Sequence, residues 1–245
     1  MVELWLVDVE AAGPALEALE ADTPRLSDDD HTRAGRLADP RERRHRLVVY
    51  SALRIALERS GGPGLRRQPF VRSDAGKPRL SPSAPAFSIA HIAGLALIGV
   101  ARSPTIGVDL ESARVLRMSP RRQQETLAVG AGLCLHDGLD APGEVDVLQA
   151  WCRLEAFGKA TGKGISGVLG ELGLRAARGR DLSFAQIRAA ARELARAERL
   201  SIADLGLRAG LYGAVASAGP LAAPQVAQFP ADPQSIARLV SEPAG

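Results

Sequence analysis

Cysteine and aromatic residues are scarce in this sequence of 245 residues. Aromatic residues make up 4% of the chain, and there are 2 cysteines, Cys134 and Cys152. Neither cysteine stands in a paired metal-binding spacing such as C-x-x-C, and nothing suggests a disulfide framework. A reducing, cytoplasmic location is therefore the simpler expectation. The core is expected to consist mostly of Leu, Ala and Val.

Long apolar runs are also absent. No stretch approaches the roughly 18 consecutive apolar residues that a membrane-spanning helix needs. The opening Met-Val-Glu-Leu-Trp-Leu lacks the basic start and long apolar run of a signal peptide. We therefore expect neither a signal peptide nor a membrane span. The 46% hydrophobic and 24% charged residues are typical of a soluble globular protein, and the length suits one large domain or two half-size ones.

The charge balance is slightly basic. The formal net charge is +3 at pH 7, and arginine greatly outnumbers lysine. Arginines cluster at Arg41, Arg43, Arg44 and Arg46, and again at Arg66 and Arg67. The clusters fit a solvated helix face. They fit equally an anionic partner such as a phosphate-bearing cofactor, an acidic protein or a nucleic acid.

Turn signals and hydrophobic periodicity predict an alternating series of strands and helices. Asp39 and Pro40 begin a long helix that ends at residues 60–63. Further helices are expected over 144–161 and 183–200. Strands are expected over 2–9, 70–72, 87–91, 95–101, 105–111, 200–207 and 211–218.

Two segments are expected to lack regular structure. Residues 17–30 are acidic and expected to be irregular, and the Pro- and Ala-rich tail after Gly219 is expected to be loosely ordered. The order of the remaining elements predicts an α+β fold of two similar halves, residues 1–111 and 112–245.

Two acids close the strand expected over 105–111. Residues i and i+2 of a strand point to the same face, so Asp109 and Glu111 are expected to project together. Adjacent carboxylates repel each other unless a cation lies between them. Their hard oxygens suit magnesium, which commonly also binds substrate phosphates. Taken alone, two solvated acids at a strand end are the simpler interpretation.

The helix over 144–161 carries a second polar group. Trp151, Glu155 and Lys159 are spaced four residues apart and therefore share one helix face. That face also carries Leu148, and a carboxylate beside an apolar stripe is costly to bury unless it is paired or metal-bound. Taken alone, a surface Glu155–Lys159 ion pair of about 0.3–0.5 kcal/mol is the simpler interpretation.

Two further segments carry weaker signals. His91 closes the stretch Phe87–His91, where a lone histidine beside apolar neighbours is more often structural than a ligand. Gly76-Lys77-Pro78 forms a turn whose lysine could contact a phosphate.

In order and spacing, these segments resemble the 4'-phosphopantetheinyl transferase superfamily, in its longer, surfactin-synthetase-activating type. That type has G-K-P, then F-N-x-S-H, G-[VI]-D-x-E and W-x-x-K-E-[AS]-x-x-K, followed by a Gly-rich turn. The matching segments here are Gly76–Pro78, Phe87–His91, Gly107–Glu111, Trp151–Lys159 and Gly162–Gly164. The region of resemblance spans roughly residues 40–165, and four motifs in register argue against a chance match.

The resemblance implies a pseudo-dimer of two similar halves with the active site in the cleft between them. It implies transfer of 4'-phosphopantetheine from coenzyme A to a serine of an acyl or peptidyl carrier protein, with release of adenosine 3',5'-bisphosphate. The pathway could be fatty-acid, polyketide or nonribosomal-peptide biosynthesis. Two such halves in one chain would make a monomer sufficient.

The resemblance also implies roles for individual residues. It implies Mg2+ bound by Asp109, Glu111 and Glu155, with Glu155 and Lys159 catalytic. The implied contacts to coenzyme A come from Lys77, His91, Lys159 and Arg46, together with Gly76 and Ala90.

Three positions depart from the family pattern. Leu154 replaces the usual lysine before the glutamate, Ser88 replaces Asn, and Ala90 replaces Ser. Arg153 is expected to restore part of the missing charge, although it points about 100° around the helix from Leu154.

The departures leave an alternative open, a degenerate relative that binds coenzyme A or a carrier protein without efficient transfer. A gain of activity in Leu154→Lys would support that alternative. A nucleic-acid-binding protein is a second alternative, but the sequence offers no recognition motif and few aromatic residues for stacking.

Overall fold

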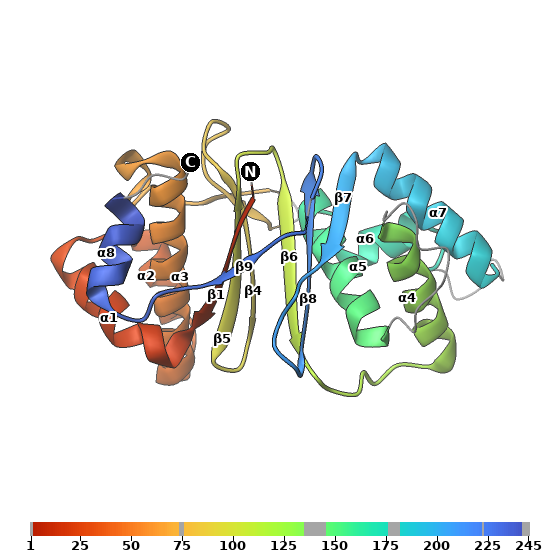
Figure 1. The fold of residues 1–245 in the computed structure, drawn as a ribbon, viewed down its shortest axis with the longest axis horizontal. Helices are drawn as coiled ribbons and strands as arrows, with labels where there is room; N and C mark the ends of the chain where they lie inside the picture. The colour runs from red at the N-terminus through yellow and green to blue at the C-terminus, as the bar shows by residue number, and fades with distance from the viewer. Residues whose placement is uncertain (1, 74–75, 135–145, 176–181, 222, 242–245) are drawn as a thin grey trace. The chain divides into compact units, whose positions relative to one another are not determined.

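The computed structural model describes residues 2–73, 76–134, 146–175, 182–221 and 223–241. Contacts within the chain divide it into two compact units. The first unit comprises residues 1–87, 91–104 and 226–245, and the second comprises residues 88–90 and 105–225. Each unit combines helices with strands, which confirms the predicted α+β class (Figure 1).

The first unit is built on a sheet of order β4-β5-β1-β9. β1 (Val2–Asp8) pairs antiparallel with β5 (Leu95–Ala101) and parallel with β9 (Val226–Gln228), and β4 (Ala86–Ile92) forms the other edge. The long helix α3 (Pro40–Gly61) contacts β5 and the other helices of this unit. Short elements η1 (Pro63–Leu65), β2 (Val71–Arg72) and β3 (Pro78–Arg79) connect α3 to β4.

The start and end of α3 follow the sequence signals. The Asp39 side chain accepts a hydrogen bond from the Arg41 amide at 2.8 Å, and Pro40 occupies the first turn, where no amide partner is needed. Gly62 ends the helix at φ +86°, a conformation that glycine adopts without steric cost. The predicted helix is therefore confirmed.

The prediction of an irregular segment over residues 17–30 is wrong. Helix α1 (Val9–Asp22) begins at Asp8, whose carboxylate accepts from the amides of Glu10 and Ala11. Helix α2 (Asp28–Gly35) begins with a capping box between Ser27 and Asp30. Three of the acids that suggested a loop, Asp28, Asp29 and Asp30, lie in the first turn of α2, where the helix dipole favours negative charge.

The prediction of a loosely ordered tail is also wrong. After Gly219 the chain forms β9, with Leu4 paired to Val226, and helix α8 (Pro233–Ser241), which contacts α1 and α3. The anchors are single apolar residues, Phe229 and Ile236, both buried. The apolar residues of α8, Ile236, Leu239 and Val240, stand at helical spacing, so the sequence did carry a signal for this helix.

The second unit has a sheet of order β6-β8-β7. β6 (Ile106–Ser112) and β7 (Leu200–Asp204) both pair antiparallel with β8 (Leu211–Ala218), and α5 (Val147–Thr161) packs on all three strands. Helix α4 (Pro120–Leu133) contacts α5 and α7 (Phe184–Ala197), while α6 (Gly164–Glu171) follows α5 (Figure 1).

The sequence did not predict α4 or α6. Two glycines interrupt the helical pattern of α4, and both lie at close contacts. A Cβ on Gly130 would lie 2.6 Å from Ala150 Cα, and one on Gly132 would lie 2.3 Å from the Arg188 carbonyl oxygen. Glycine usually indicates the end of a helix in sequence patterns. In α4, Gly130 and Gly132 instead allow the helix to approach α5 and α7 closely.

The remaining predicted strands and helices are found close to their expected limits, although residues 144–145 of the second predicted helix lie outside the described residues. The pseudo-dimer and the division into halves after Glu111 stay predictions. None of the helices that the structure describes has the length and apolar character needed to cross a membrane.

Candidate active site

The second unit brings strand β6 directly against helix α5 at Gly107. A Cβ on Gly107 would lie 2.0 Å from the Ala156 carbonyl oxygen and 2.5 Å from the Ala160 amide nitrogen. Only a residue without a side chain fits there, because real Cβ atoms do not approach the backbone so closely. This contact sets the distance between the acidic end of β6 and the polar face of α5.

Asp109 and Lys159 meet two residues further along β6. Lys159 Nζ donates to Asp109 Oδ1 at 2.7 Å and to the Val108 carbonyl oxygen at 3.0 Å. Asp109 is 6% exposed. Its second oxygen, Oδ2, is buried and has no hydrogen-bond partner within bonding distance among the described residues, although a contact between the carboxylate and the Cys152 side chain partly offsets the rise in the pKa of Asp109 that burial causes. A buried carboxylate oxygen without a donor is an unusual feature that suits a ligand for a cation.

Glu155 lies on the same half-buried face of α5 as Lys159. Trp151, Glu155 and Lys159 are all partly exposed, whereas Leu148, which the sequence pattern placed on the same face, is buried. The Asp146 side chain caps the helix by accepting from the Leu148 amide at 2.8 Å.

The carboxylates influence one another electrostatically. Burial raises the pKa of Asp109, the Lys159 ammonium opposes that shift, and Glu111 adds to it. Burial, and then the charge of Asp109, raises the pKa of Glu155. The charges of Asp109 and Glu111 therefore both disfavour a negative charge on Glu155.

Glu111 has a basic partner of its own. Arg114 donates to both Glu111 oxygens, from Nη2 to Oε1 at 2.8 Å and from Nε to Oε2 at 3.1 Å. Within the described parts of the chain, no three His, Cys, Asp or Glu side chains stand together as a ready-made metal site. The carboxylate oxygens, including Asp109 Oδ2, are of the kind that a hard cation binds. Two of the three carboxylates already have a basic partner, because Lys159 pairs with Asp109 and Arg114 pairs with Glu111.

Four of the other predicted residues belong to the first unit. Lys77 is half-buried, and burial lowers the pKa of its ammonium to about 8. Gly76 precedes it at φ +80°, in a turn where Ser73 accepts from the Gly76 amide at 2.7 Å. Arg46 lies over the Tyr50 ring on α3, and His91 is exposed on β4.

Comparison with known proteins shows the family. No family model matches the chain. A protein of Synechocystis sp., slr0495, assigned to the 4'-phosphopantetheinyl transferases, is 31% identical over 186 residues, which cover 69% of this chain and 68% of that protein. The 4'-phosphopantetheinyl transferase HetI of Nostoc sp. is 30% identical over 174 residues, which cover 67% of this chain and 70% of HetI. The chain belongs to the 4'-phosphopantetheinyl transferase family.

Two departures from the phosphopantetheinyl transferase pattern have structural roles on β4. Ser88 is buried, and its hydroxyl oxygen accepts a hydrogen bond from the Val108 amide at 3.1 Å. Ala90 is also buried. Ser88 therefore supports the strand that carries Asp109, a role that sequence patterns did not indicate.

The expectation that Arg153 replaces the missing lysine of this transferase family is wrong. Its guanidinium donates two hydrogen bonds to Asp204 on β7, from Nε to Oδ1 at 2.7 Å and from Nη2 to Oδ2 at 2.6 Å. It also donates to the Gly130 carbonyl oxygen of α4 at 3.2 Å. Although burial alone would lower the pKa of Arg153, the Asp204 carboxylate raises it. Arg153 thus connects α5 to α4 and β7.

Leu154 is a core residue in this family member. It is 1% exposed and packs in the apolar cluster of the second unit with Phe157 and Val129. A lysine there would enter that cluster, so adding the family's usual residue would not add a charge to the site.

Leu154→Lys is therefore expected to destabilise the protein rather than activate it. An uncompensated charge in a core costs about 3–5 kcal/mol, and each kcal/mol lowers the melting temperature of a protein this size by about 2–4 °C. Thermal unfolding followed by circular dichroism measures the change. Leu154→Met, which conserves volume, is the control and is expected to cost less than about 1.5 kcal/mol. A Leu154→Lys protein with unchanged stability and faster transfer would instead support the degenerate alternative.

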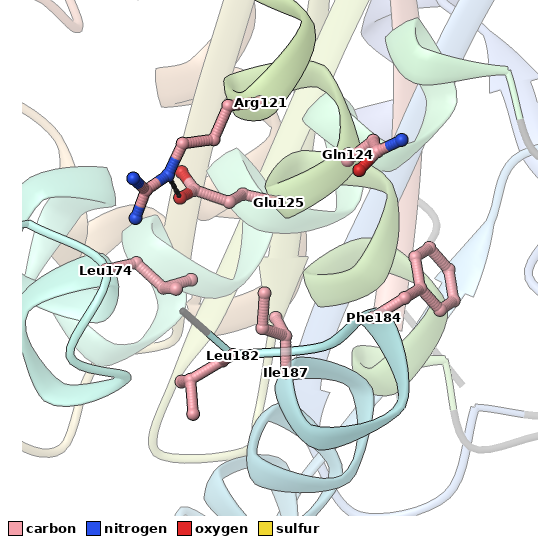
Figure 2. Close-up of a pocket in the computed structure, with 7 residues that line it drawn as sticks. All are labelled: Arg121, Gln124, Glu125, Leu174, Leu182, Phe184 and Ile187. Atoms are coloured by element: carbon pink, nitrogen blue, oxygen red, sulfur yellow. Dashed lines mark hydrogen bonds and ion pairs between the residues drawn. The ribbon is translucent and has the colours of Figure 1, made fainter. Parts of the chain in front are cut away.

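A separate pocket of about 170 Å³ lies between α4, α7 and the segments at Leu174 and Leu182. Figure 2 shows Leu174, Leu182 and Ile187 on one side and the Arg121–Glu125 ion pair, at 2.9 Å, on the other. None of the predicted site residues lines this pocket.

Proposed function

We propose that this transferase moves 4'-phosphopantetheine from coenzyme A to a serine of an acyl or peptidyl carrier protein and releases adenosine 3',5'-bisphosphate. The observation that carries the proposal is the Asp109–Lys159 contact, because it joins two of the family motifs at one place, beside Glu155. We also assign the chain to the surfactin-synthetase-activating type, on its four motifs in register.

Glu155 is proposed as the general base. Its carboxylate takes the proton of the carrier serine, directly or through a water, while the serine oxygen bonds to the phosphorus atom that carries the pantetheine arm. The bond from that phosphorus to the bridging oxygen breaks, and adenosine 3',5'-bisphosphate leaves. The raised pKa of Glu155, caused first by burial, supports this role because a base works best when its pKa lies near the working pH.

Lys159 is proposed to contact the leaving phosphate and either stabilise its charge or donate a proton to it. The Lys159 side chain is 31% exposed, so part of it is accessible to a ligand while its ammonium group bonds to the buried Asp109. Positioning and charge neutralisation would supply most of the rate enhancement, as in phosphoryl transfer generally.

Asp109, Glu111 and Glu155 are proposed to hold Mg2+. The ion would supply positive charge at the coenzyme A pyrophosphate. The unbonded Asp109 Oδ2 is the described atom that most directly supports this assignment.

Coenzyme A is proposed to contact Lys77, His91 and Arg46, next to Gly76 and Ala90. Its affinity is expected to fall between pH 7 and pH 9, because the Lys77 ammonium, with its pKa lowered by burial to about 8, loses its charge in that interval. The fall attributable to Lys77 reaches about tenfold, since roughly a tenth of the groups stay charged one unit above the pKa.

Isothermal titration calorimetry of coenzyme A at the two pH values measures this effect. Lys77→Arg is the control, because arginine stays protonated throughout. If Lys77→Arg loses affinity as steeply as the wild type, the role of Lys77 is contradicted.

The proposed protein partner is a small, acidic, helical carrier protein. A net positive chain favours association with such a partner, and the complex is expected to be transient. Incubation with a fluorescent coenzyme A conjugate and a panel of apo carrier proteins tests this. Label is expected on carriers from one or more pathways and not on matched carriers whose acceptor serine is changed to alanine. Equal labelling of the serine and alanine forms would contradict the proposal.

A further inference from the structure

We propose that Arg114 competes with the divalent cation for Glu111 and thereby sets how tightly the site binds that cation. This inference rests on the proposed metal role of Glu111. Arg114 itself belongs to none of the motifs that define the family resemblance.

The geometry places Arg114 on both metal-binding atoms of Glu111. The two parallel hydrogen bonds, at 2.8 and 3.1 Å, occupy Oε1 and Oε2 together. A fork of this kind is the strongest way for an arginine to hold a carboxylate. A cation that binds Glu111 needs at least one of the same oxygens, so the two partners compete.

The backbone keeps Arg114 close to Glu111. Glu111 lies at the end of β6, paired with Tyr212 of β8, and the Ala113 amide donates to the Gly210 carbonyl oxygen at 2.8 Å. These backbone contacts hold the chain just after β6, so the backbone of Arg114 lies close to Glu111. Contact with Glu111 raises the pKa of Arg114 further, and arginine does not lose its proton in proteins, so it leaves Glu111 by displacement.

The pair is exposed enough to be displaced. The Arg114 side chain is 49% exposed, and that of Glu111 is 15% exposed. Ion pairs on the surface contribute little net stability because water and salt screen them. The Lys159–Asp109 ion pair is less exposed than the Arg114–Glu111 pair, because Asp109 is buried. Lys159 also has a proposed catalytic role, so we assign the competition to Arg114.

Titration with Mn2+ alone, followed by the electron paramagnetic resonance signal of the free ion, tests the inference without coenzyme A or carrier. Arg114→Gln is expected to bind Mn2+ about two- to fivefold more tightly than the wild type, the range that corresponds to a surface ion pair. The ratio of the two dissociation constants is expected to shrink in high salt, because salt weakens the pair.

Two control variants separate competition from a general charge effect. Arg122→Gln removes the same charge from an arginine that also pairs with a glutamate three residues away, Glu125, and is expected to bind Mn2+ as the wild type does. Arg114→Lys keeps the charge but loses the fork, and is expected to bind Mn2+ with intermediate affinity.

Equal Mn2+ affinities of Arg114→Gln and the wild type would overturn the inference, as would an equal gain in Arg122→Gln. The outcome is distinct from that of the proposed function. A wild type that transfers phosphopantetheine while Arg114→Gln shows no gain contradicts only the inference. A gain in Arg114→Gln with no transfer to any carrier contradicts only the proposed function.

Discussion

Glu155→Gln is expected to lose phosphopantetheine transfer by about 10²–10⁴-fold, the usual contribution of a general base, while still binding coenzyme A. The amide keeps the size of the side chain but cannot accept the serine proton. Initial rates with a saturating apo carrier protein measure the loss, and calorimetry measures coenzyme A binding.

Glu171→Gln is the matched control for this change. Glu171 lies on α6 in the same unit and pairs with Lys163, outside the group of site carboxylates. Its glutamine variant is expected to transfer at the wild-type rate. Wild-type turnover in Glu155→Gln would remove Glu155 as the base.

Glu155→Gln is also expected to change the stability of the protein when a chelator is present. Burial raises the pKa of Glu155 above its ordinary value of 4.5, so the folded state holds the proton more tightly than the unfolded state. The resulting stabilisation is complete below that ordinary value and is lost as pH rises through the folded-state pKa. Glu155→Gln is therefore expected to melt higher than the wild type at neutral pH, and this advantage is expected to vanish at acidic pH.

Gly107→Ala is expected to disrupt the second unit. The added Cβ would lie 2.0 Å from the Ala156 carbonyl oxygen, and that atom belongs to the backbone of α5, so it cannot rotate away. Overpacking of this kind costs about 1–3 kcal/mol and occasionally more. The variant is expected to melt lower by about 2–4 °C for each kcal/mol and to lose transfer, because β6 and α5 carry the site.

Gly170→Ala is the control for Gly107→Ala. Gly170 is on helix α6, where an added Cβ meets no atom within 4 Å. Alanine is favoured over glycine within helices, so this variant is expected to be as stable as the wild type or slightly more stable. A Gly107→Ala protein with unchanged melting temperature and activity would show that β6 and α5 do not meet as described.

Sequence patterns predicted the elements that carry the site better than those at the ends of the first unit. β6 and α5 have strong local signals: apolar Val108 and Leu110 alternate with acidic Asp109 and Glu111 in β6, and α5 has an apolar stripe that repeats at helical spacing. α1 depends instead on a capping aspartate, Asp8, and the short strand β9 on pairing with β1. Such tertiary contacts override weak local preferences.

The candidate site was predictable as a set of residues but not as a set of contacts. Spacing along a strand or helix indicates that Asp109 and Glu111, or Glu155 and Lys159, share a face. It does not indicate that Lys159 reaches Asp109 or that Arg153 turns to Asp204, because those pairs lie about 50 residues apart in sequence. Arg114 had a visible signal, a spacing of three residues from Glu111, but surface pairs of that kind are common.

The intact mass of an apo carrier protein, after incubation with this transferase, coenzyme A and Mg2+, shows whether phosphopantetheine is transferred. We expect a gain of one phosphopantetheine, roughly 340 Da by its covalent composition, that disappears with a chelator and with Glu155→Gln. No gain on any acyl or peptidyl carrier, with coenzyme A still bound, would contradict transfer and indicate a degenerate member of the family.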